Sequence, residues 1–395
     1  MELRFRTAGE SHGPLVLAVV EGVPAGLDLD PGAIDRDLAR RQGGYGRGGR
    51  MTIEADRVEI LGGVRWGRTT GAPVVLAVRN RDWENWRRGM SPLAADRGAV
   101  PRLTRVRPGH ADLPGMLKHG LDDARDVLER ASARETAARV AAGAVAKAVL
   151  GVVGIRVGSF VTSVGEVEAP WDGSFPELHE RAERGRLRMP DPDADARAVS
   201  AVDEARARGD TLGGTFVCFA TEVPAGLGTH AVAEERLDAR LGAAFLSIPA
   251  VKGVEVGIGF EAARRPGSQV HDEILPGGPG DRRRGGVRRP TNRAGGLEGG
   301  ITNGEAVWVR AAMKPIPTLM RPLRTVDVAT GRPADASRER SDVCAVPAAS
   351  VVGEAALAFE LARALVAKFG ADSVADLRKA LEAYLDRINR WWQGS

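Results

Sequence analysis

A stretch of this sequence occurs twice, about 200 residues apart, and it restricts the folds open to the chain. Residues 9–27 and 209–227 each hold a glycine turn, an apolar run and the identical ending Val-Pro-Ala-Gly-Leu. The turn glycines Gly9 and Gly209 align as well. Turn–strand–turn units can look alike by chance, but the identical ending favours a duplication. We therefore expect two similar halves in one chain.

The segments that follow each copy also correspond. A helix-like stretch comes first, an apolar strand follows, and an alanine-rich helix comes later in each half. The expected pairs are helices at 31–41 and 231–244, strands at 72–78 and 305–312, and long helices at 133–150 and 348–369. This order predicts an α+β fold, with pseudo-repeats of approximately residues 1–200 and 201–395.

Composition restricts the class of protein. The 395 residues are 43% hydrophobic and 27% charged, which is typical of a globular chain with a sizeable core. No apolar run reaches the roughly 18 residues of a membrane helix, and the N-terminus lacks an apolar signal region. We therefore expect no membrane association and a cytoplasmic location. Cys218 and Cys344 are far apart and lack metal-ligand spacing, so we expect reduced, buried thiols and no metal site.

Arginine dominates the cationic residues. Of the 56 lysines and arginines only six are lysines, although the formal net charge is only +4. Ion pairs on solvated faces and a genomic composition bias account for most of this excess. Arginine is also the side chain that best holds carboxylates and phosphates, through paired N–H donors. We therefore expect some of these arginines to bind an anionic ligand.

The first candidate for chemistry is His12, in the turn Gly9-Glu10-Ser11-His12-Gly13. The flanking glycines let the backbone approach a ligand closely and hold the histidine on a tight turn. The second copy has Leu212 at the corresponding position. Because the repeated turn folds without a histidine, a chemical role for His12 is favoured over a structural one.

The second candidate is a glycine–arginine loop. Residues 40–50 read Arg-Arg-Gln-Gly-Gly-Tyr-Gly-Arg-Gly-Gly-Arg. Four arginines on a flexible glycine loop predict an anion clamp that closes over a ligand. An RNA-binding loop or a plain surface loop is the alternative, although only Tyr45 can stack on a base there.

Two further segments carry polar groups on turns. His110 lies in Arg107-Pro-Gly-His-Ala-Asp112, and an isolated histidine of this kind is either structural or functional. Ser132 is a plausible helix N-cap with an arginine two residues to either side. A helix start of this type suits a phosphate as well as it suits a simple cap with salt bridges.

The C-terminal half offers two more candidates. The proline-stiffened segment Lys314–Thr318 can serve a phosphate or a flavin carbonyl, or it is only a rigid connection. Asp342 stands before the second long helix as a base, an anchor or a cap. No glycine-rich nucleotide-binding pattern stands in the strand–turn–helix context that a Rossmann or P-loop enzyme needs.

Taken together and in this order, these segments resemble the chorismate synthase family. The matching segments are residues 9–13, 41–51, 107–112, 130–143, 210–214, 247–255, 292–304, 314–318 and 340–354. They run across essentially the whole chain. Each segment alone is modest evidence, but the ordered set is very specific.

The resemblance implies a shikimate-pathway lyase that converts 5-enolpyruvylshikimate 3-phosphate to chorismate and phosphate by trans-1,4-elimination. It implies a need for reduced FMN without net redox change, with NADPH as a possible reductant. It also implies a single domain, residues 1–395, that folds as an internally duplicated β-α-β sandwich with helices between antiparallel sheets. Family members are typically cytosolic homotetramers.

The resemblance further implies roles for individual residues. His12 assists phosphate departure as an acid, His110 supports the anionic reduced flavin, and Asp342 exchanges a proton with flavin N5. The residues implied for FMN binding are Arg130, Ala131, Ser132, Pro249, Ala250, Gly299, Lys314, Pro315, Ile316, Pro317, Thr318 and Arg340. The residues implied for NADPH or substrate binding are Arg41, Arg47, Arg50, Arg107 and Arg134.

The chain departs from the family pattern at a few positions. Pro249 replaces an asparagine found in many members, so only a backbone contact with the flavin is expected there. Arg293 stands where histidine is common, and Ser341 and Val343 replace a frequent histidine and proline. None of these changes removes a proposed catalytic group.

Two other functions stay open at this point. An arginine-rich RNA-binding protein would interleave basic and aromatic residues, yet only 5% of the residues are aromatic. A simple flavin reductase would not need the four-arginine loop. The source of reduced FMN, either NADPH or an outside donor, also stays open.

Overall fold

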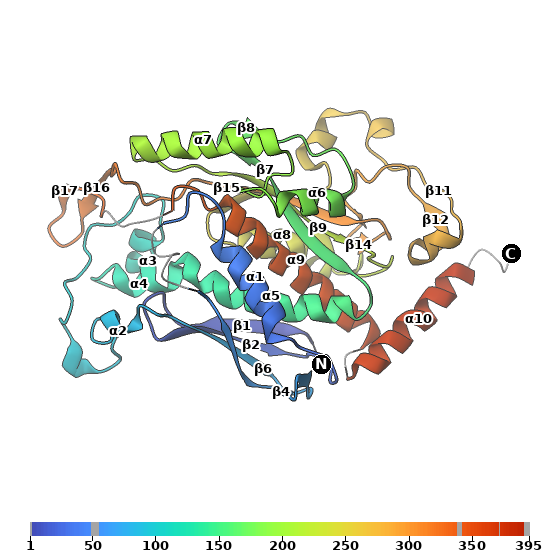
Figure 1. Cartoon of the computed structure of the whole chain (residues 1–395), viewed down its shortest axis with the longest axis horizontal. Helices are drawn as coiled ribbons and strands as arrows, with labels where there is room; N and C mark the ends of the chain where they lie inside the picture. The colour runs from blue at the N-terminus through green and yellow to red at the C-terminus, as the bar shows by residue number, and fades with distance from the viewer. Residues whose placement is uncertain (1, 49–54, 338–341, 371, 391–395) are drawn as a thin grey trace.

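The computed structural model describes residues 2–48, 55–337, 342–370 and 372–390. Figure 1 shows two β-sheets with a layer of helices between them. Neighbouring strands in both sheets pair antiparallel. The expected sandwich of antiparallel sheets around helices is therefore confirmed.

The first sheet has the strand order β1-β2-β6-β3. Its strands are β1 Arg4–Ala8, β2 Leu15–Glu21, β6 Val74–Arg79 and β3 Val58–Gly62. Side chains along β2 alternate between buried and half-buried, and Val16, Ala18 and Val20 belong to the core. The apolar run after the His12 turn is thus one strand with one face against the helices.

The second sheet has the order β8-β7-β9-β15-β10. Its strands are β7 Arg156–Val164, β8 Val167–Glu168, β9 Gly214–Thr221, β15 Val307–Met313 and β10 Val251–Val256. Strands β7, β9, β15 and β10 repeat the order of β1, β2, β6 and β3. Cys218 on β9 and Cys344 before the last long helix are buried free thiols, as expected.

From the strand order we infer that the junction between the halves lies earlier than residue 200. Because β7 corresponds to β1, the second half begins near Arg156, after α5 ends at Gly151. The segment between β7 and β9 carries α6 Phe175–Ala182 and α7 Pro192–Arg208, whereas a short turn joins β1 to β2. This long insertion moves the second copy of the motif to residue 209 and hides the true start of its half.

The layer between the sheets contains the helices that the sequence predicted (Figure 1). They are α1 Pro31–Gln42, α5 Thr136–Gly151, α8 Leu237–Leu246 and α9 Val346–Phe369. Helix α8 begins later than expected, because residues 233–235 form a short 3-10 turn. Helices α5 and α9 are apolar on nearly all sides, which suits helices enclosed by two sheets.

The remaining elements lie around this sandwich. Short and peripheral helices are α2 Trp83–Trp86, α3 Asp112–His119, α4 Arg125–Ala131 and α10 Val374–Arg390. Small hairpins are β4 Val64–Arg65 with β5 Arg68–Thr69, β11 Leu275–Pro276 with β12 Val287–Arg288, β13 Leu297–Glu298 with β14 Ile301–Thr302, and β16 Arg324–Asp327 with β17 Arg332–Asp335. Among the described helices, none has the length and apolarity to cross a lipid bilayer.

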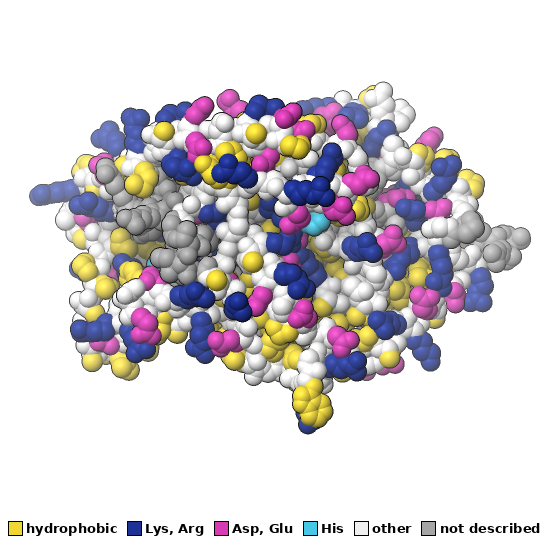
Figure 2. Space-filling model, viewed as in Figure 1, with side chains coloured by type: hydrophobic (Ala, Val, Ile, Leu, Met, Phe, Trp, Pro, Cys, Tyr) yellow, Lys and Arg dark blue, Asp and Glu magenta, His cyan; other side chains and the backbone are white. Residues whose placement is uncertain are grey.

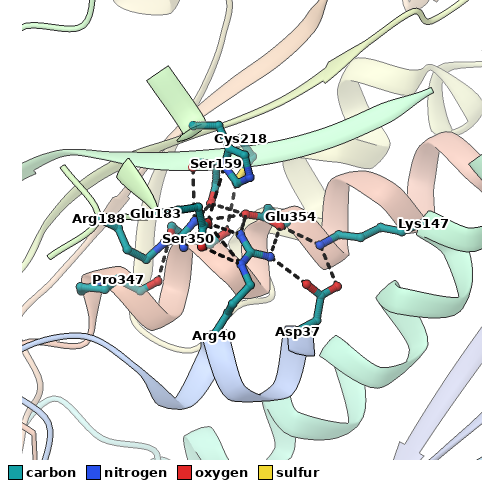
Figure 3. A network of polar contacts seen from close by, with 11 residues as sticks. Asp37, Arg40, Lys147, Ser159, Glu183, Arg188, Cys218, Pro347, Ser350 and Glu354 are labelled. Atoms are coloured by element: carbon teal, nitrogen blue, oxygen red, sulfur yellow. Dashed lines mark hydrogen bonds and ion pairs between the residues drawn. The ribbon is translucent and has the colours of Figure 1, made fainter. Parts of the chain in front are cut away.

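A buried group of charges ties the central helices together (Figure 3). Glu354 on α9 is fully buried and accepts hydrogen bonds from Arg40 on α1, at 2.6 and 2.9 Å, and from Lys147 on α5, at 2.7 Å. Lys147 also donates to Asp37 at 2.9 Å, and Arg188 lies 3.3 Å from Glu354. Helices of both halves therefore share one ion-pair network.

The same group includes a possible set of metal ligands. His179, Glu183 and Glu354 bring three ligand atoms within 4.8 Å of one another. Arg40 pairs with both carboxylates, and Arg188 pairs with both as well. Carboxylates that are already neutralised by arginines favour an ion-pair network over a metal centre.

The charged side chains on the face in Figure 2 are mixed in sign. Lys and Arg side chains are scattered over this face among Asp and Glu side chains. A nucleic-acid-binding surface instead gathers positive charge on one face. The described part of this face therefore gives no support to an RNA-binding function.

Candidate active site

A cavity of about 490 Å³ lies where segments from both halves meet. Its lining residues fall within 11–12, 41–48, 107–111, 128–136, 248–250, 313–318 and 342–352. These segments are far apart in the sequence, and nearly all of them carry a candidate identified above. The fold thus brings the predicted chemical groups to a single site.

Both central helices begin at this cavity. Ala133 and Thr136, at the start of α5, and Ala345 and Ala348, at the start of α9, line its wall. Ser132 Oγ caps the short turn before α5 by accepting the Arg134 N–H at 3.3 Å. The first N–H groups of a helix carry partial positive charge. Two converging helix starts therefore favour an anionic ligand.

Cationic side chains outnumber carboxylates among the described lining residues. The cations are Arg41, Arg47, Arg107, Arg134 and Lys314, and the one carboxylate is Asp342. Electrostatic attraction is stronger in an enclosed site than in bulk water. The cavity is therefore suited to a ligand with several negative charges.

Arg41 and Arg134 are anchored by neutral and acidic partners behind the wall. Arg41 Nε donates to Thr136 Oγ1 at 2.8 Å, and Arg134 Nε donates to Asn80 Oδ1 at 2.7 Å. Both guanidinium groups also pair with the buried carboxylate of Asp56. The one carboxylate of Asp56 thus holds both guanidinium groups at this wall.

His110 belongs to a tight polar group on its Pro-Gly turn. Its Nδ1 lies 2.6 Å from Asp112 Oδ1, and Asp112 also accepts Arg107 Nε at 2.9 Å. Burial alone would raise the pKa of Asp112, but hydrogen bonds from His110 and Arg107 hold it well below its usual range. Lys314 Nζ donates to the Gly109 carbonyl at 2.6 Å, so the loop after β15 is joined to this turn.

His12 is fixed by Glu129, which the sequence analysis did not single out. His12 Nδ1 lies 2.9 Å from Glu129 Oε1, and the His12 backbone N–H donates to Oε2 at 2.8 Å. The imidazole ring packs against Trp86, with centroids 4.4 Å apart. Only 2% of the Glu129 side chain is exposed, so water has little access to its carboxylate.

Asp342 joins the start of the second long helix to the glycine–arginine loop. Its Oδ2 lies 2.7 Å from Arg47 Nη1, and its Oδ1 accepts the Gly48 N–H at 2.6 Å. The N-cap of α9 is Ala345, which has no side-chain capping bond. The alternative of Asp342 as a helix cap is therefore wrong. Arg340, expected to hold this carboxylate, lies outside the described residues.

The cavity also has apolar walls. Apolar lining residues include Leu128, Ile248, Met313, Ile316 and Val352. Ala250 adopts φ +68°, a left-handed conformation that costs a non-glycine residue roughly 1–2 kcal/mol. Its carbonyl accepts the Lys314 N–H at 2.9 Å. Backbone strain of this kind is frequent where a chain is held against a ligand.

Most of the predicted site residues line the cavity. They are His12, His110, Asp342, Ala131, Ser132, Pro249, Ala250, Lys314, Ile316, Pro317, Thr318, Arg41, Arg47, Arg107 and Arg134. Of the others, the structure leaves Arg130, Pro315 and Gly299 out of the lining. Arg50 and Arg340 are outside the described residues.

The residues left out of the lining have other surroundings. Arg130 donates to the carbonyls of Thr7 and Gly9 and so supports the His12 turn from behind. Gly299 lies in the turn between β13 and β14. Pro315 follows Lys314 in the loop but does not itself form part of the wall. Flavin contacts of these three residues stay predictions.

Several residues that support the site could not be predicted from the sequence. They are Glu129, Asp56, Asn80 and Trp86. A single glutamate or aspartate outside a glycine-rich turn is typical of a solvated surface. Only the fold shows that Glu129 is buried beside His12, and its one sequence signal is its position directly before the predicted segment at Arg130.

Comparisons with known proteins identify the family to which the chain belongs. The family model described as chorismate synthase matches residues 3–366. The chain belongs to the chorismate synthase family. Curated chorismate synthases similar to it include that of Geobacter metallireducens, 54% identical over 393 residues, covering 98% of this chain and 99% of the relative. That of Rubrobacter xylanophilus is 56% identical over 389 residues, with 98% of each covered.

A solved structure agrees with the sequence relatives. A crystal structure of chorismate synthase matches with a TM-score of 0.80 and 43% identity, and 99% of each chain is covered. The chain therefore has the activity of its family, a carbon–oxygen lyase of the shikimate pathway. The alternatives of an RNA-binding protein and a simple flavin reductase are set aside by this assignment.

Proposed function

We propose that the 490 Å³ cavity binds reduced FMN together with 5-enolpyruvylshikimate 3-phosphate, and that trans-1,4-elimination of phosphate takes place there. One observation carries the proposal. His12, His110 and Asp342 converge with five cationic side chains on one cavity. This combination supplies both proton-transfer groups and compensation for a polyanionic ligand.

The cavity walls fit a flavin mononucleotide. The cavity volume falls within the range of about 300–1,000 Å³ that is usual for cofactor sites. Apolar side chains such as Leu128, Met313 and Val352 suit a flat ring system, and the helix start after Ser132 suits a phosphate. Reduced FMN, when bound here, would supply electron density to the substrate and an acceptor for the ring hydrogen.

The residues that would hold the flavin come from three segments. They are Ala131 and Ser132, Pro249 and Ala250, and Lys314 with Ile316, Pro317 and Thr318. Lys314 is oriented by the Gly109 carbonyl, and its backbone N–H by the Ala250 carbonyl. The segments at Ala250 and Lys314 are thereby fixed relative to the His110 turn. Flavin binding stays a prediction for Arg130, Gly299, Pro315 and Arg340.

The arginines of the cavity suit the substrate. The ester carries a phosphate and two carboxylates, and Arg107, Arg134, Arg41 and Arg47 line the same space. Arg41 and Arg134 share the buried carboxylate of Asp56, which holds both guanidinium groups at the wall of the cavity. Arg47 lines the cavity while it is paired with Asp342. A contact between Arg50 and the substrate stays a prediction.

The two histidines and Asp342 have different roles in the reaction. His12 donates a proton to the leaving phosphate, whose departure requires both neutralised charge and an acid. His110, oriented by Asp112, would lie beside the bound flavin and support its anionic reduced form. Asp342 would exchange a proton with the bound flavin. Arg47 and the Gly48 N–H orient its carboxylate for that exchange.

The assembly and the reductant belong to the same proposal. The family resemblance supports a cytoplasmic homotetramer, which light scattering of the purified protein measures directly. NADPH stays a possible reductant, with Arg41 and Arg47 as its predicted contacts. Anaerobic oxidation of NADPH by the protein with oxidised FMN would reveal intrinsic reductase activity, and its absence would point to an outside donor.

An anaerobic assay tests the proposed function. Chemically reduced FMN and the substrate ester are mixed with the protein, and chorismate and phosphate are followed together. We expect the two products in equal amounts with no net oxidation of the flavin. Oxidised FMN serves as the control and should give no product. Absence of chorismate with reduced FMN present would contradict the proposal.

A further inference from the structure

Glu129 is bound to His12 through both the side chain and the backbone. The His12 Nδ1 lies 2.9 and 3.0 Å from the two Glu129 carboxylate oxygens. The His12 backbone N–H donates to the same carboxylate at 2.8 Å. The Ser11 N–H donates to the Glu129 main-chain carbonyl at 3.0 Å. The turn that carries His12 is thus attached to α4 at three points.

The Glu129 carboxylate is ionised in this setting. Burial alone would raise its pKa, but hydrogen bonds from His12 and the nearby charge of Arg125 hold that pKa below its usual range. Arg125 Nη1 lies 3.5 Å from Oε1, and the guanidinium also stacks on Trp86 at 4.8 Å. An ionised carboxylate only accepts hydrogen bonds. The Nδ1 of His12 must therefore carry a proton.

We propose that Glu129 is a positioning residue, which fixes the Nδ1–H form of His12 so that proton transfer takes place at Nε2. This inference rests on the proposed function, in which His12 is the acid for the leaving phosphate. In that step the Nε2–H bond of the imidazolium breaks and an O–H bond forms on phosphate. Glu129 stabilises the imidazolium beforehand and holds the neutral Nδ1–H tautomer afterwards.

Trp86 completes the support of the ring. Its indole lies against His12 at 4.4 Å with an interplanar angle of 36°, and its Nε1 donates to Asp82 at 3.1 Å. The imidazole therefore has an acidic partner at its Nδ1 edge and an aromatic partner on its face. Such a ring has little freedom to turn and exchange its two nitrogens.

The variant Glu129→Gln tests this role. Glutamine keeps the shape but lacks the charge and can present an N–H to Nδ1, which favours the wrong tautomer. We expect turnover of the FMN-bound enzyme to fall by about 10²–10⁴-fold. The dissociation constants of reduced FMN and substrate should change by less than about threefold, since Glu129 acts through His12. Glu204→Gln, at an exposed pair with Arg208, is the matched control.

A double variant separates positioning from general structural support. If Glu129 acts through His12, adding Glu129→Gln to His12→Ala should lower turnover by no more than about threefold further. If the double variant instead loses turnover by the product of the two single-variant factors, the inference is overturned. Near wild-type turnover of Glu129→Gln would also overturn it. If His12→Ala itself retains turnover, the proposed acid role fails, and that result is visible without any change at Glu129.

A spectroscopic measurement keeps the inference testable if the variant does not fold. The ¹⁵N shifts of histidine distinguish Nδ1–H from Nε2–H rings, and the signal of His12 is assigned by its loss in His12→Ala. In the wild-type protein with oxidised FMN we expect a protonated Nδ1 at His12 under all conditions of pH at which the protein is folded. An Nε2–H ring with a bare Nδ1 would overturn the inference, whatever the turnover.

Discussion

At the level of single residues, the two cavity histidines are supported in the same way. The Nδ1 of His12 faces Glu129, and the Nδ1 of His110 faces Asp112. Each of these carboxylates also pairs with an arginine, and each has its pKa held below the usual range despite burial. The site therefore holds two imidazoles, each with a buried carboxylate at its Nδ1.

Replacement of His12 tests its role as the acid. His12→Ala should fold and bind FMN, because the second copy of the turn has Leu212 at this position and folds. Turnover should fall by about 10²–10⁴-fold, the range that general acid catalysis contributes. Steady-state rates and a flavin titration measure the two effects. A loss well below about 10²-fold with intact flavin binding would exclude the acid role.

The substitution Asp342→Asn tests whether Asp342 exchanges a proton or only anchors the loop. Asparagine still accepts the Gly48 N–H but neither pairs with Arg47 nor exchanges a proton. We expect a near-normal melting temperature and turnover lower by roughly two orders of magnitude or more, measured in single turnovers with pre-reduced FMN. Arg47→Ala is the matched variant, since it removes the ion pair and keeps the carboxylate. At saturating substrate, an equal loss of the single-turnover rate in both variants would make Asp342 an anchor of the loop only.

The sequence could predict catalytic residues on glycine turns but not their partners. His12 and His110 stand between residues that force tight turns, and the repeat shows that the turn does not require the first of them. Glu129 and Asp56 carry no such signal, because a carboxylate in an ordinary context is most often solvated. Their roles depend on contacts across more than 70 residues, which only the folded chain reveals.

At the level of elements, the close contact of α5 and α9 sets the thickness of the helical layer. A Cβ placed on Gly143 of α5 would lie 2.2 Å from the Cβ of Ala355 on α9. The two helices can approach this closely only because both residues are small. Their starts are thereby held side by side at the cavity, where both favour an anion.

Gly143→Ala should therefore destabilise the protein, although alanine is the better helix former by about 1 kcal/mol. The added methyl group forces the helices apart, and overpacking of this kind costs about 1–3 kcal/mol. Urea unfolding measures the change. Gly151→Ala, at the end of the same helix with open space around its Cβ, is the control and should be neutral or slightly stabilising. A Gly143→Ala protein as stable as the control would contradict the account of the helix pair.

At the level of the whole molecule, the two halves share one core and one charge network. Arg40 and Lys147 come from the first half, and Arg188 and Glu354 come from the second. The duplicated strands and the long helices could be predicted, because turn glycines and periodic apolar runs are local signals. The junction near Arg156 could not, because the insertion between β7 and β9 has no counterpart in the first half.

The ion-pair network around Glu354 should stabilise the fold less at low pH than at neutral pH. Burial alone would raise the pKa of Glu354, but Lys147, Arg40 and Arg188 hold it well below the ordinary value of 4.5. A carboxyl group with a lowered pKa in the folded state stabilises fully above its unfolded pKa and loses this contribution as the pH falls below it. Glu354→Gln should lower the free energy of unfolding by about 3–5 kcal/mol at neutral pH.

The difference in unfolding free energy between the wild-type protein and Glu354→Gln should become smaller as the pH is lowered from about 5 toward 3. In this range the wild-type carboxyl group becomes protonated in the unfolded state, so its ionised form no longer adds stability. Urea titrations of both proteins at several pH values measure this difference. The control Glu204→Gln removes one partner of an exposed pair and should change stability by less than about 1 kcal/mol at each pH. A deficit that stays constant or grows on acidification would contradict the role given to the network.

The central claim is that one cavity holds the flavin and the substrate beside His12. A crystal structure with oxidised FMN and the substrate ester tests it most directly, because the oxidised cofactor leaves the ester intact. We expect the flavin against Ser132, Ala250 and Lys314, and the ester phosphate within hydrogen-bond reach of His12, at about 2.6–3.2 Å. Flavin density outside this cavity, or a phosphate held away from His12 on the far side of the flavin, would contradict the account.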